Sequence, residues 1–221
     1  SLKTVALYGN YMILFNSLQA LITVLLTSVT ASVGNMITEG DKGLITKVFR
    51  ELFASRFLMV AICCFGLWLL AEPFIGLWGG SEYILDHRTL VLIVILFFLN
   101  TMRTVVDVFI NAYGIFKDIW SPIAEAVIFV SSALILAPRY GLNGILAAQI
   151  LELVLVVYLW KPYFLFSTGM KIRFGIYVRL FFKSMAAGAV AFAIGYAATA
   201  AMMTVPRRWC WMFSLSVYWI T

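Results

Sequence analysis

The sequence is poor in the residues from which soluble domains and catalytic sites are built. Only 12% of its 221 residues are charged, and it has three cysteines and a single histidine. Two of the cysteines, Cys63 and Cys64, are adjacent inside an apolar run, so the sequence offers neither a disulfide framework nor a metal-binding spacing. We therefore expect no cofactor and no metal. A soluble domain normally has about a quarter of its residues charged, so the scarcity of charge excludes that class.

Apolar residues make up 63% of the sequence, and the mean hydropathy is +1.00. This composition predicts an integral membrane protein that is all-α, a polytopic bundle of transmembrane helices. A spanning helix needs about 20 mostly apolar residues. No short cleavable signal precedes the first apolar run, so we interpret that run as a span. Six complete runs are present, and a seventh begins at Trp211; the six cover residues 11–33, 57–79, 89–114, 119–137, 143–160 and 180–203.

Basic residues are divided unequally between alternate loops. By the positive-inside rule, the richer side is cytoplasmic, so the first span runs from outside to inside. Because the basic residues are spread over short loops, the net charge of +6 does not indicate a nucleic-acid partner. On the richer side are Lys42, Lys47, Arg50, Arg56, Lys117, Lys161, Lys171, Arg173, Arg179 and Lys183; on the other are Arg88, Arg139, Arg207 and Arg208.

Polar residues interrupt the third span at helical spacing. At about 100° per residue, Asn100, Arg103, Asp107 and Asn111 fall within roughly a quarter of the helix circumference. A lone Arg or Asp at the bilayer centre costs roughly 2.5 to 3.5 kcal/mol, so this face is expected to meet protein or water. Arg103 and Asp107 are four residues apart and are expected to pair. The alternative is that these groups only hydrogen-bond between helices.

The first span repeats this pattern with Asn16, Gln19 and Thr23, followed by Thr27 and Thr30. Two acids in later spans are further candidates. Glu125 follows a helix start, where an acid also suits the helix dipole, and Glu152 lies mid-span, where it could simply meet a neighbouring donor. No catalytic residue is expected. The candidate substrate-binding residues are Asn16, Gln19, Thr23, Asn100, Arg103, Asp107 and Asn111, with Glu125 and Glu152 as possible additions.

Three further segments predict local structure. Residues 41–53 (DKGLITKVFRELF) place apolar residues on one face, which indicates a helix lying in the cytoplasmic interface or, alternatively, the entry of the second span. Residues 161–183 mix basic and aromatic residues, which suits anionic lipid headgroups but also follows from topology alone. Gly144 and Ala148 form a small-xxx-small face that allows close helix approach.

Across residues 5–168 the order and spacing of several segments resemble bacterial polysaccharide biosynthesis transporters. These are the O-antigen or capsule repeat-unit flippases of the multidrug/oligosaccharidyl-lipid/polysaccharide exporter superfamily. The segments are LYGNYMILFNSLQALITVLLTSVTASVGNMITEGDK, VFRELF, EPFIGLWGG, DVFINAYGIFKDIWSPIAEA, RYGLNGILAAQI and WKPYFLF.

The resemblance implies one half of an alternating-access transporter built from two six-helix bundles and two extra helices. Residues 1–163 would be five transmembrane helices of the second bundle. Residues 164–221 would be a basic interfacial segment plus one complete and one truncated extra helix. We expect a fragment whose partners are the missing N-terminal bundle of the same protein, membrane lipids and the substrate.

The function implied is that of a transporter and not of an enzyme. It would move an oligosaccharide repeat unit, linked to a polyprenyl pyrophosphate lipid, across the bacterial cytoplasmic (inner) membrane. An anionic pyrophosphate needs a cation, for which Arg103 is the candidate, while a glycan needs amide and hydroxyl partners. Asp107 would hold Arg103 in place or release it.

Two alternatives remain open at this point. A cation-coupled multidrug exporter of the same superfamily would favour a more apolar cavity with isolated acids. A membrane glycosyl- or acyltransferase would need a catalytic acid or histidine near one membrane face, and Asp86 with His87 is the only such pair.

Overall fold

The computed structural model describes residues 2–115 and 120–204, and within these ranges all regular secondary structure is helical. The chain divides into two compact units, Ser1–Phe181 and Phe182–Thr221. The all-α prediction is confirmed. The α-helices are α1 (Leu2–Glu39), α2 (Lys42–Trp78), α3 (His87–Ala112), α4 (Trp120–Tyr140), α5 (Leu142–Glu152), α6 (Lys161–Phe164) and α7 (Gly175–Thr204); η1 (Ser81–Tyr83) is a 3₁₀ turn, and η2 (Leu153–Trp160) and η3 (Leu165–Gly169) are π-helical.

Six helices in the described part of the chain are long and apolar enough to cross a membrane. Each overlaps one of the six predicted runs, so the prediction of a multi-pass membrane protein is confirmed. The seventh run, from Trp211, lies outside the described residues. The six spans are Thr4–Val24, Lys42–Trp78, His87–Ala112, Trp120–Tyr140, Leu142–Gly169 and Gly175–Thr199.

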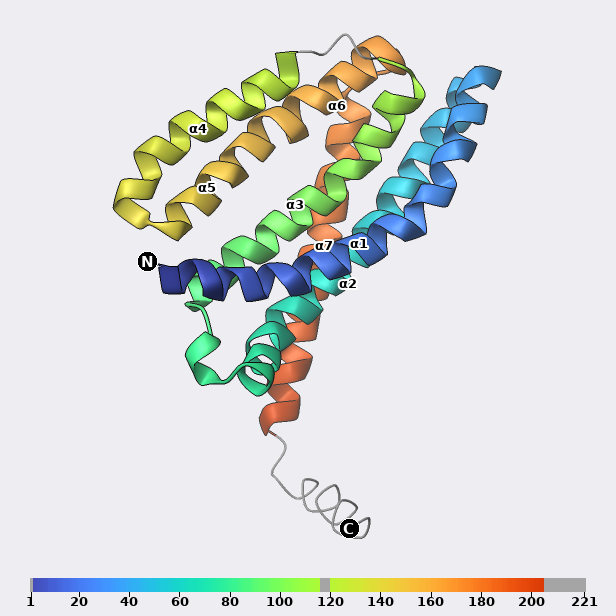
Figure 1. Cartoon of the computed structure of the whole chain (residues 1–221). Helices are drawn as coiled ribbons and strands as arrows, with labels where there is room; N and C mark the ends of the chain where they lie inside the picture. The colour runs from blue at the N-terminus through green and yellow to red at the C-terminus, as the bar shows by residue number, and fades with distance from the viewer. Residues whose placement is uncertain (1, 116–119, 205–221) are drawn as a thin grey trace. The chain divides into compact units, whose positions relative to one another are not determined.

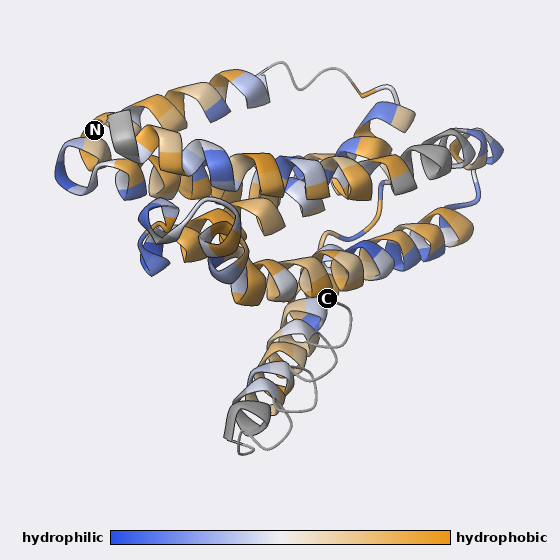
Figure 2. Ribbon diagram, turned by 60° about the horizontal axis from the view of Figure 1, so that its bottom comes forward, coloured by the Kyte–Doolittle hydropathy of each residue, from blue (hydrophilic) through white to orange (hydrophobic). Residues whose placement is uncertain are grey.

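Helix α3 is the centre of the first unit and the most buried of the six described spans. It packs against α1, α2 and α5, while α4 lies antiparallel beside α5 (Figure 1). The ribbons are largely apolar along their length (Figure 2). Large hydrophobic side chains also point outward, among them Leu58, Leu70 and Leu134, each more than three-fifths exposed. Lipid rather than water is the solvent that makes such a surface stable.

Helix α2 begins early and runs without a break. The Asp41 carboxylate caps it by accepting from the backbone N–H groups of Gly43 at 2.8 Å and Leu44 at 3.2 Å. Its 37 residues extend for about 55 Å, well beyond the roughly 30 Å of hydrocarbon core. Residues 42–53 are thus the first turns of the same continuous helix as the second span, and not a helix of their own.

An aromatic cluster joins the first turns of α2 to three later elements. The Phe49 ring lies 5.1 Å from Phe109 on α3 and 5.2 Å from Phe166 on η3, both edge to face. Phe53 meets Tyr177, near the start of α7, at 6.0 Å. Edge-to-face pairs add stability beyond the area they bury, so this cluster fixes one end of the unit.

Helices α4 and α5 approach closely at Gly144, as the small-xxx-small pattern predicts. A Cβ atom placed there would overlap the backbone carbonyl of Leu136 and lie 2.9 Å from the backbone nitrogen of Ala137. Ala148, one turn further along α5, is fully buried. A side chain at position 144 would force the two helices apart.

Candidate functional site

A small open pocket lies between three helices of the first unit. Four amide side chains reach it: Asn16 and Gln19 from α1, Asn100 from α3 and Gln149 from α5. We call it the amide pocket. The polar residues predicted separately on the first and third spans therefore meet. Its remaining lining consists of Tyr8, Met12, Phe15, Ile93, Leu96 and Phe97.

The amide pocket has a firm apolar base. The Phe15 and Phe97 rings meet edge to face with centroids 5.7 Å apart, which fixes α1 against α3. The Asn100 amide nitrogen donates to the carbonyl of Leu96 at 3.1 Å, so the side chain is oriented by its own helix. Its amide oxygen is left to accept from a ligand.

Gln149 is the pocket residue that the sequence analysis missed. It lies three residues before Glu152, so the two share a face of α5. That spacing is the same signal that identified the polar residues of the first and third spans, and it would have found Gln149.

Two candidates lie apart from the pocket lining. The Thr23 hydroxyl donates to the carbonyl of Gln19 at 2.8 Å, so its hydrogen bond lies within α1. Asn111 is exposed near the end of α3. The side chains of Thr27 and Thr30 lie outside those that the structure describes.

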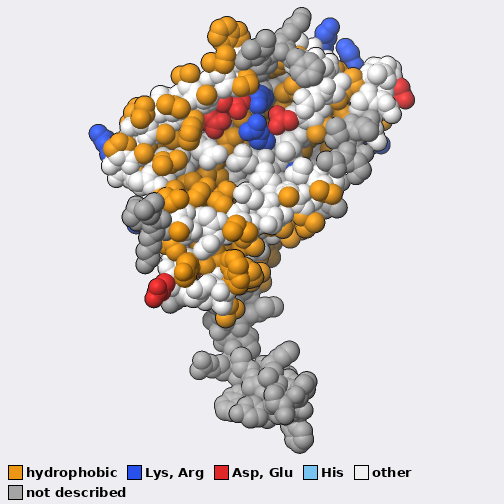
Figure 3. Space-filling view, in the orientation of Figure 1, with side chains coloured by type: hydrophobic (Ala, Val, Ile, Leu, Met, Phe, Trp, Pro, Cys, Tyr) orange, Lys and Arg blue, Asp and Glu red, His pale blue; other side chains and the backbone are white. Residues whose placement is uncertain are grey.

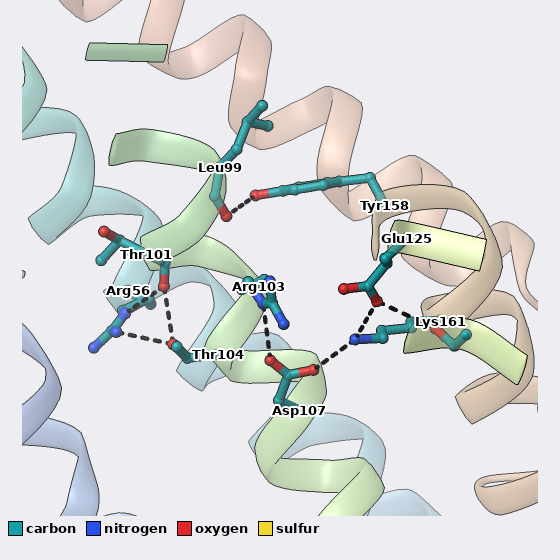
Figure 4. A network of polar contacts seen from close by, with 10 residues as sticks. Arg56, Leu99, Thr101, Arg103, Thr104, Asp107, Glu125, Tyr158 and Lys161 are labelled. Atoms are coloured by element: carbon teal, nitrogen blue, oxygen red, sulfur yellow. Dashed lines mark hydrogen bonds and ion pairs between the residues drawn. The ribbon is translucent and has the colours of Figure 1, made fainter. Parts of the chain in front are cut away.

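One turn beyond Asn100, α3 contributes a pair of charges. The Arg103 Nε atom donates to Asp107 Oδ2 at 3.3 Å, which confirms the predicted pairing. A third charged residue joins them, because Lys161 Nζ lies 4.0 Å from Asp107 Oδ1 and 2.8 Å from Glu125 Oε1 (Figure 4). Lys161 thus links α3 to α4.

Glu125 and Glu152 complete this group of charges. Glu125 also accepts a hydrogen bond from the Ser121 hydroxyl at 3.3 Å. It lies beyond the first turn of α4, so the prediction that it serves the helix dipole at the helix start is wrong. Glu152 is only 8% exposed and interacts electrostatically with Glu125, Arg103 and Lys161. We call these five residues, Arg103, Asp107, Glu125, Glu152 and Lys161, the charge cluster. Two cations face three carboxylates, which leaves one formal negative charge.

Lys161 was assigned from the sequence to a cytoplasmic loop, and the structure corrects this. Its side chain is 13% exposed and lies inside the span Leu142–Gly169. The cause is the π-helical stretch η2. Lys161 follows Glu152 by nine residues. In an α-helix, at about 100° per residue, this spacing would place the two side chains on opposite faces, roughly 180° apart. At about 4.4 residues per π-helical turn they fall within roughly 20° of one another, on one face.

The amide pocket and the charge cluster are continuous. On α3, Asn100, Arg103 and Asp107 follow one another at helical spacing, and on α5 Gln149 leads to Glu152 in the same way. Figure 3 shows acidic and basic side chains gathered in one patch among hydrophobic ones. Arg103 and Asp107 keep 28% and 30% of their side chains exposed. This polar stripe, the pocket plus the cluster, is therefore open to a ligand.

A further arginine lies on the other side of α3 (Figure 4). Arg56, assigned from the sequence to a loop, is fully buried within α2, and this too is a correction. It donates to the carbonyls of Ile22 at 2.9 Å and Thr101 at 3.2 Å and to the Thr104 hydroxyl at 2.8 Å. In the described part of the chain no carboxylate pairs with it. Its side chain connects three helices through their backbones.

The single histidine of the sequence, His87, is not part of the polar stripe, and its ring is hydrogen-bonded to Glu72. His87 Nδ1, at the start of α3, is 2.9 Å from Glu72 Oε1, in the last turns of α2. Asp86, at the N-cap position of α3, makes no side-chain cap bond. Within residues 2–115 and 120–204, no three His, Cys, Asp or Glu side chains are grouped as metal ligands would be.

A comparison of the chain with known protein families, with curated proteins and with solved structures finds no match. Any function proposed for the chain therefore rests on its membrane-spanning helical fold and its polar stripe.

Proposed function

We propose that this chain is part of a transporter that flips polyprenyl-pyrophosphate-linked oligosaccharide repeat units across the bacterial cytoplasmic membrane by alternating access. The observation that carries the proposal is the polar stripe, in which amides from three spanning helices meet beside five charged side chains. Groups of this kind are costly inside a membrane and are typical of substrate pathways. Transport breaks no covalent bond, so the proposal needs no catalytic residue.

The amide pocket is the proposed glycan site. Each Asn or Gln side chain offers two N–H donors and a carbonyl acceptor, which match the hydroxyl groups of a sugar ring. Tyr8, which is partly exposed, supplies apolar surface for a ring face. Because the pocket is open along one side, a chain of several sugars can extend from it toward the rest of the transporter. The N-terminal bundle of such a transporter would form the facing wall.

The charge cluster is the proposed pyrophosphate site, with one modification of the sequence-based hypothesis. Arg103 is not a free cation, because Arg103 and Lys161 are both paired with carboxylates. A pyrophosphate must therefore compete with Asp107 and Glu125 for these cations. Such competition makes the cluster a two-state element, closed on itself without substrate and open to the phosphates with it.

The glycan site is tested by replacing the Asn100 and Gln149 amides together with leucine in the protein as the cell makes it. Surface glycan and membrane abundance are measured in a strain that lacks its own flippase. Glycan is expected to fall at least tenfold at unchanged abundance, since the apolar side chains cannot replace the lost hydrogen bonds. Asn35→Leu, an exposed amide on the same helix as Asn16, is the matched control. Normal glycan output from the double variant would refute the site.

The second candidate is a cation-coupled multidrug exporter, which the formal negative charge of the cluster favours. An organic cation would be attracted to Glu152 and Glu125 more readily than a pyrophosphate would. The two functions separate in one assay. Glu152→Gln should lower resistance to cationic drugs if the exporter is correct, and should leave drug resistance unchanged if the protein carries lipid-linked sugars.

A further inference from the structure

A second open pocket lies where the span Leu142–Gly169 ends and α7 begins. It is a shallow, open depression, and it belongs to the first unit. Because it lies between the ends of two spanning helices, it is located at a membrane boundary. Its lining combines two basic residues, a hydroxyl group and apolar side chains: Phe166, Ser167, Lys171, Ile172, Arg173 and Ile176.

The backbone at this pocket is held in an unusual shape. Lys171 has φ of 51°, the one non-glycine residue of positive φ in the described part of the chain. The neighbouring backbone is tied down on both sides, since Met170 donates to Leu165 and Ile172 donates to Phe166, both at 3.0 Å. A lysine in the left-handed region costs about 1 to 3 kcal/mol, and strain of this kind is concentrated at functional positions.

An aromatic floor keeps this shape rigid. The Phe166 ring meets Phe49 at 5.2 Å and Tyr177 at 5.9 Å, and Phe174 stacks on Tyr177 at 5.7 Å. Phe166 itself lines the pocket. The basic residues are thus presented from a packed support and not from a free loop, which lowers the cost of ordering them around a ligand.

The positive charge of the pocket has no ion-pair partner among the residues that the structure describes. Lys171 and Arg173 are both exposed and form no ion pair with the residues that the structure describes. The sequence contains no aspartate or glutamate after Glu152. Two exposed cations without an ion-pair partner among the described residues will attract an anion.

We propose that this pocket binds the phosphate headgroup of an anionic phospholipid. Lys171 and Arg173 contact the phosphate, and the Ser167 hydroxyl, which now donates to the carbonyl of Phe164 at 3.2 Å, can turn toward it. Ile172 and Ile176 provide the apolar contacts that a lipid offers and a soluble phosphate lacks. The proposal does not depend on which substrate the polar stripe carries.

The test measures lipid binding by the purified chain in a neutral detergent. Phosphatidylglycerol and phosphatidylcholine with identical acyl chains are titrated separately, and inorganic phosphate and a polyprenyl pyrophosphate are titrated as further probes. The variant is Lys171→Asn with Arg173→Gln, because asparagine accepts the left-handed backbone. The matched control, Lys42→Asn with Arg50→Gln, removes the same two charges from exposed positions on α2.

Saturable binding of phosphatidylglycerol, and much weaker binding of phosphatidylcholine, is expected. Each basic residue near an anionic headgroup contributes roughly a factor of five in affinity, so the variant should bind about 25-fold more weakly while the control changes less than threefold. Unchanged thermal stability without lipid shows that the variant is folded. A charge-conserving variant, Lys171→Arg with Arg173→Lys, should keep most of the affinity for phosphatidylglycerol. If the first variant is unstable, the affinity of this second variant is the test of the proposal.

Three results would overturn the proposal. An equal loss in the control variant would mean general electrostatic attraction. Equal affinity for phosphatidylcholine would mean that the headgroup charge is not recognised. Tighter binding of the polyprenyl pyrophosphate than of phosphatidylglycerol, lost in the same variant, would assign the pocket to the substrate instead.

Discussion

Substitutions of the buried Arg56 can separate the contribution of packing to the stability of the protein from the contribution of charge. Its side chain is fully buried, and it donates to two helix carbonyls and the Thr104 hydroxyl. The carbonyls of Ile22 and Thr101 lie inside α1 and α3, so they keep their helical N–H partners when the guanidinium is removed. The Thr104 hydroxyl also donates to the carbonyl of Thr101 at 2.9 Å. Removing Arg56 therefore leaves none of these three acceptor groups without a hydrogen-bond partner.

The expected loss in the free energy of unfolding follows from these contacts. Arg56→Ala removes a long buried side chain and leaves a cavity, which costs about 2 to 5 kcal/mol in the free energy of unfolding. Arg56→Met fills most of the same volume without a charge. Because replacing a buried charge by an apolar side chain of similar size is often neutral, Arg56→Met should lose no more than about 1.5 kcal/mol.

The assay is unfolding of the purified protein in detergent, followed by tryptophan fluorescence against temperature or sodium dodecyl sulfate. Arg50→Ala, on the exposed part of α2, is the control and should change stability by less than about 0.5 kcal/mol. If Arg56→Met is as unstable as Arg56→Ala, the charge and its hydrogen bonds stabilise the helices, and the packing argument is refuted. If Arg56→Ala is as stable as the parent, the side chain is not buried as described.

Three further predictions concern contacts between helices. Gly144→Ala should lower the melting temperature by several degrees, because its Cβ overlaps the Leu136 carbonyl, whereas Gly66→Ala, which meets nothing within 4 Å, should not. Tyr158→Phe removes the hydroxyl that donates to the carbonyl of Leu99 at 2.8 Å and should cost about 1 kcal/mol in denaturant unfolding; no loss would mean that lipid or water replaces the bond. Lys161→Met leaves Glu125 and Asp107 facing each other without their shared cation, so membrane abundance should fall, and Lys161→Arg should restore it; equal abundance of both variants would contradict a stabilising role.

The fold was largely predictable because a membrane limits the possible structures. An all-helical chain with six spans follows from run length and composition, since only helices and closed barrels satisfy their backbone groups in lipid. The Arg103 to Asp107 pair and the close approach at Gly144 follow from helical spacing in the same way. Each of these depends only on residues close together in the sequence.

What could not be predicted depends on residues far apart or on departures from the α-helix. Arg56 and Lys161 were interpreted as loop cations because positively charged residues usually mark loops. Arg56 is instead satisfied by backbone carbonyls of two other helices, which carry no sequence signal. Lys161 reaches the charge cluster through the π-helical η2, whose apolar sequence is the same as that of an ordinary span.

The π-helical stretch also determines how the chain tolerates changes in length. At a lipid-facing helix end, a residue gained or lost moves only exposed atoms. If the stretch Leu153–Trp160 lost one residue and stayed π-helical, the helix after it would rotate by roughly 80°. Lys161 would leave its carboxylates, and the lysine and arginine of the second pocket would turn with it. The number of residues in this stretch is therefore as strongly constrained as their identity.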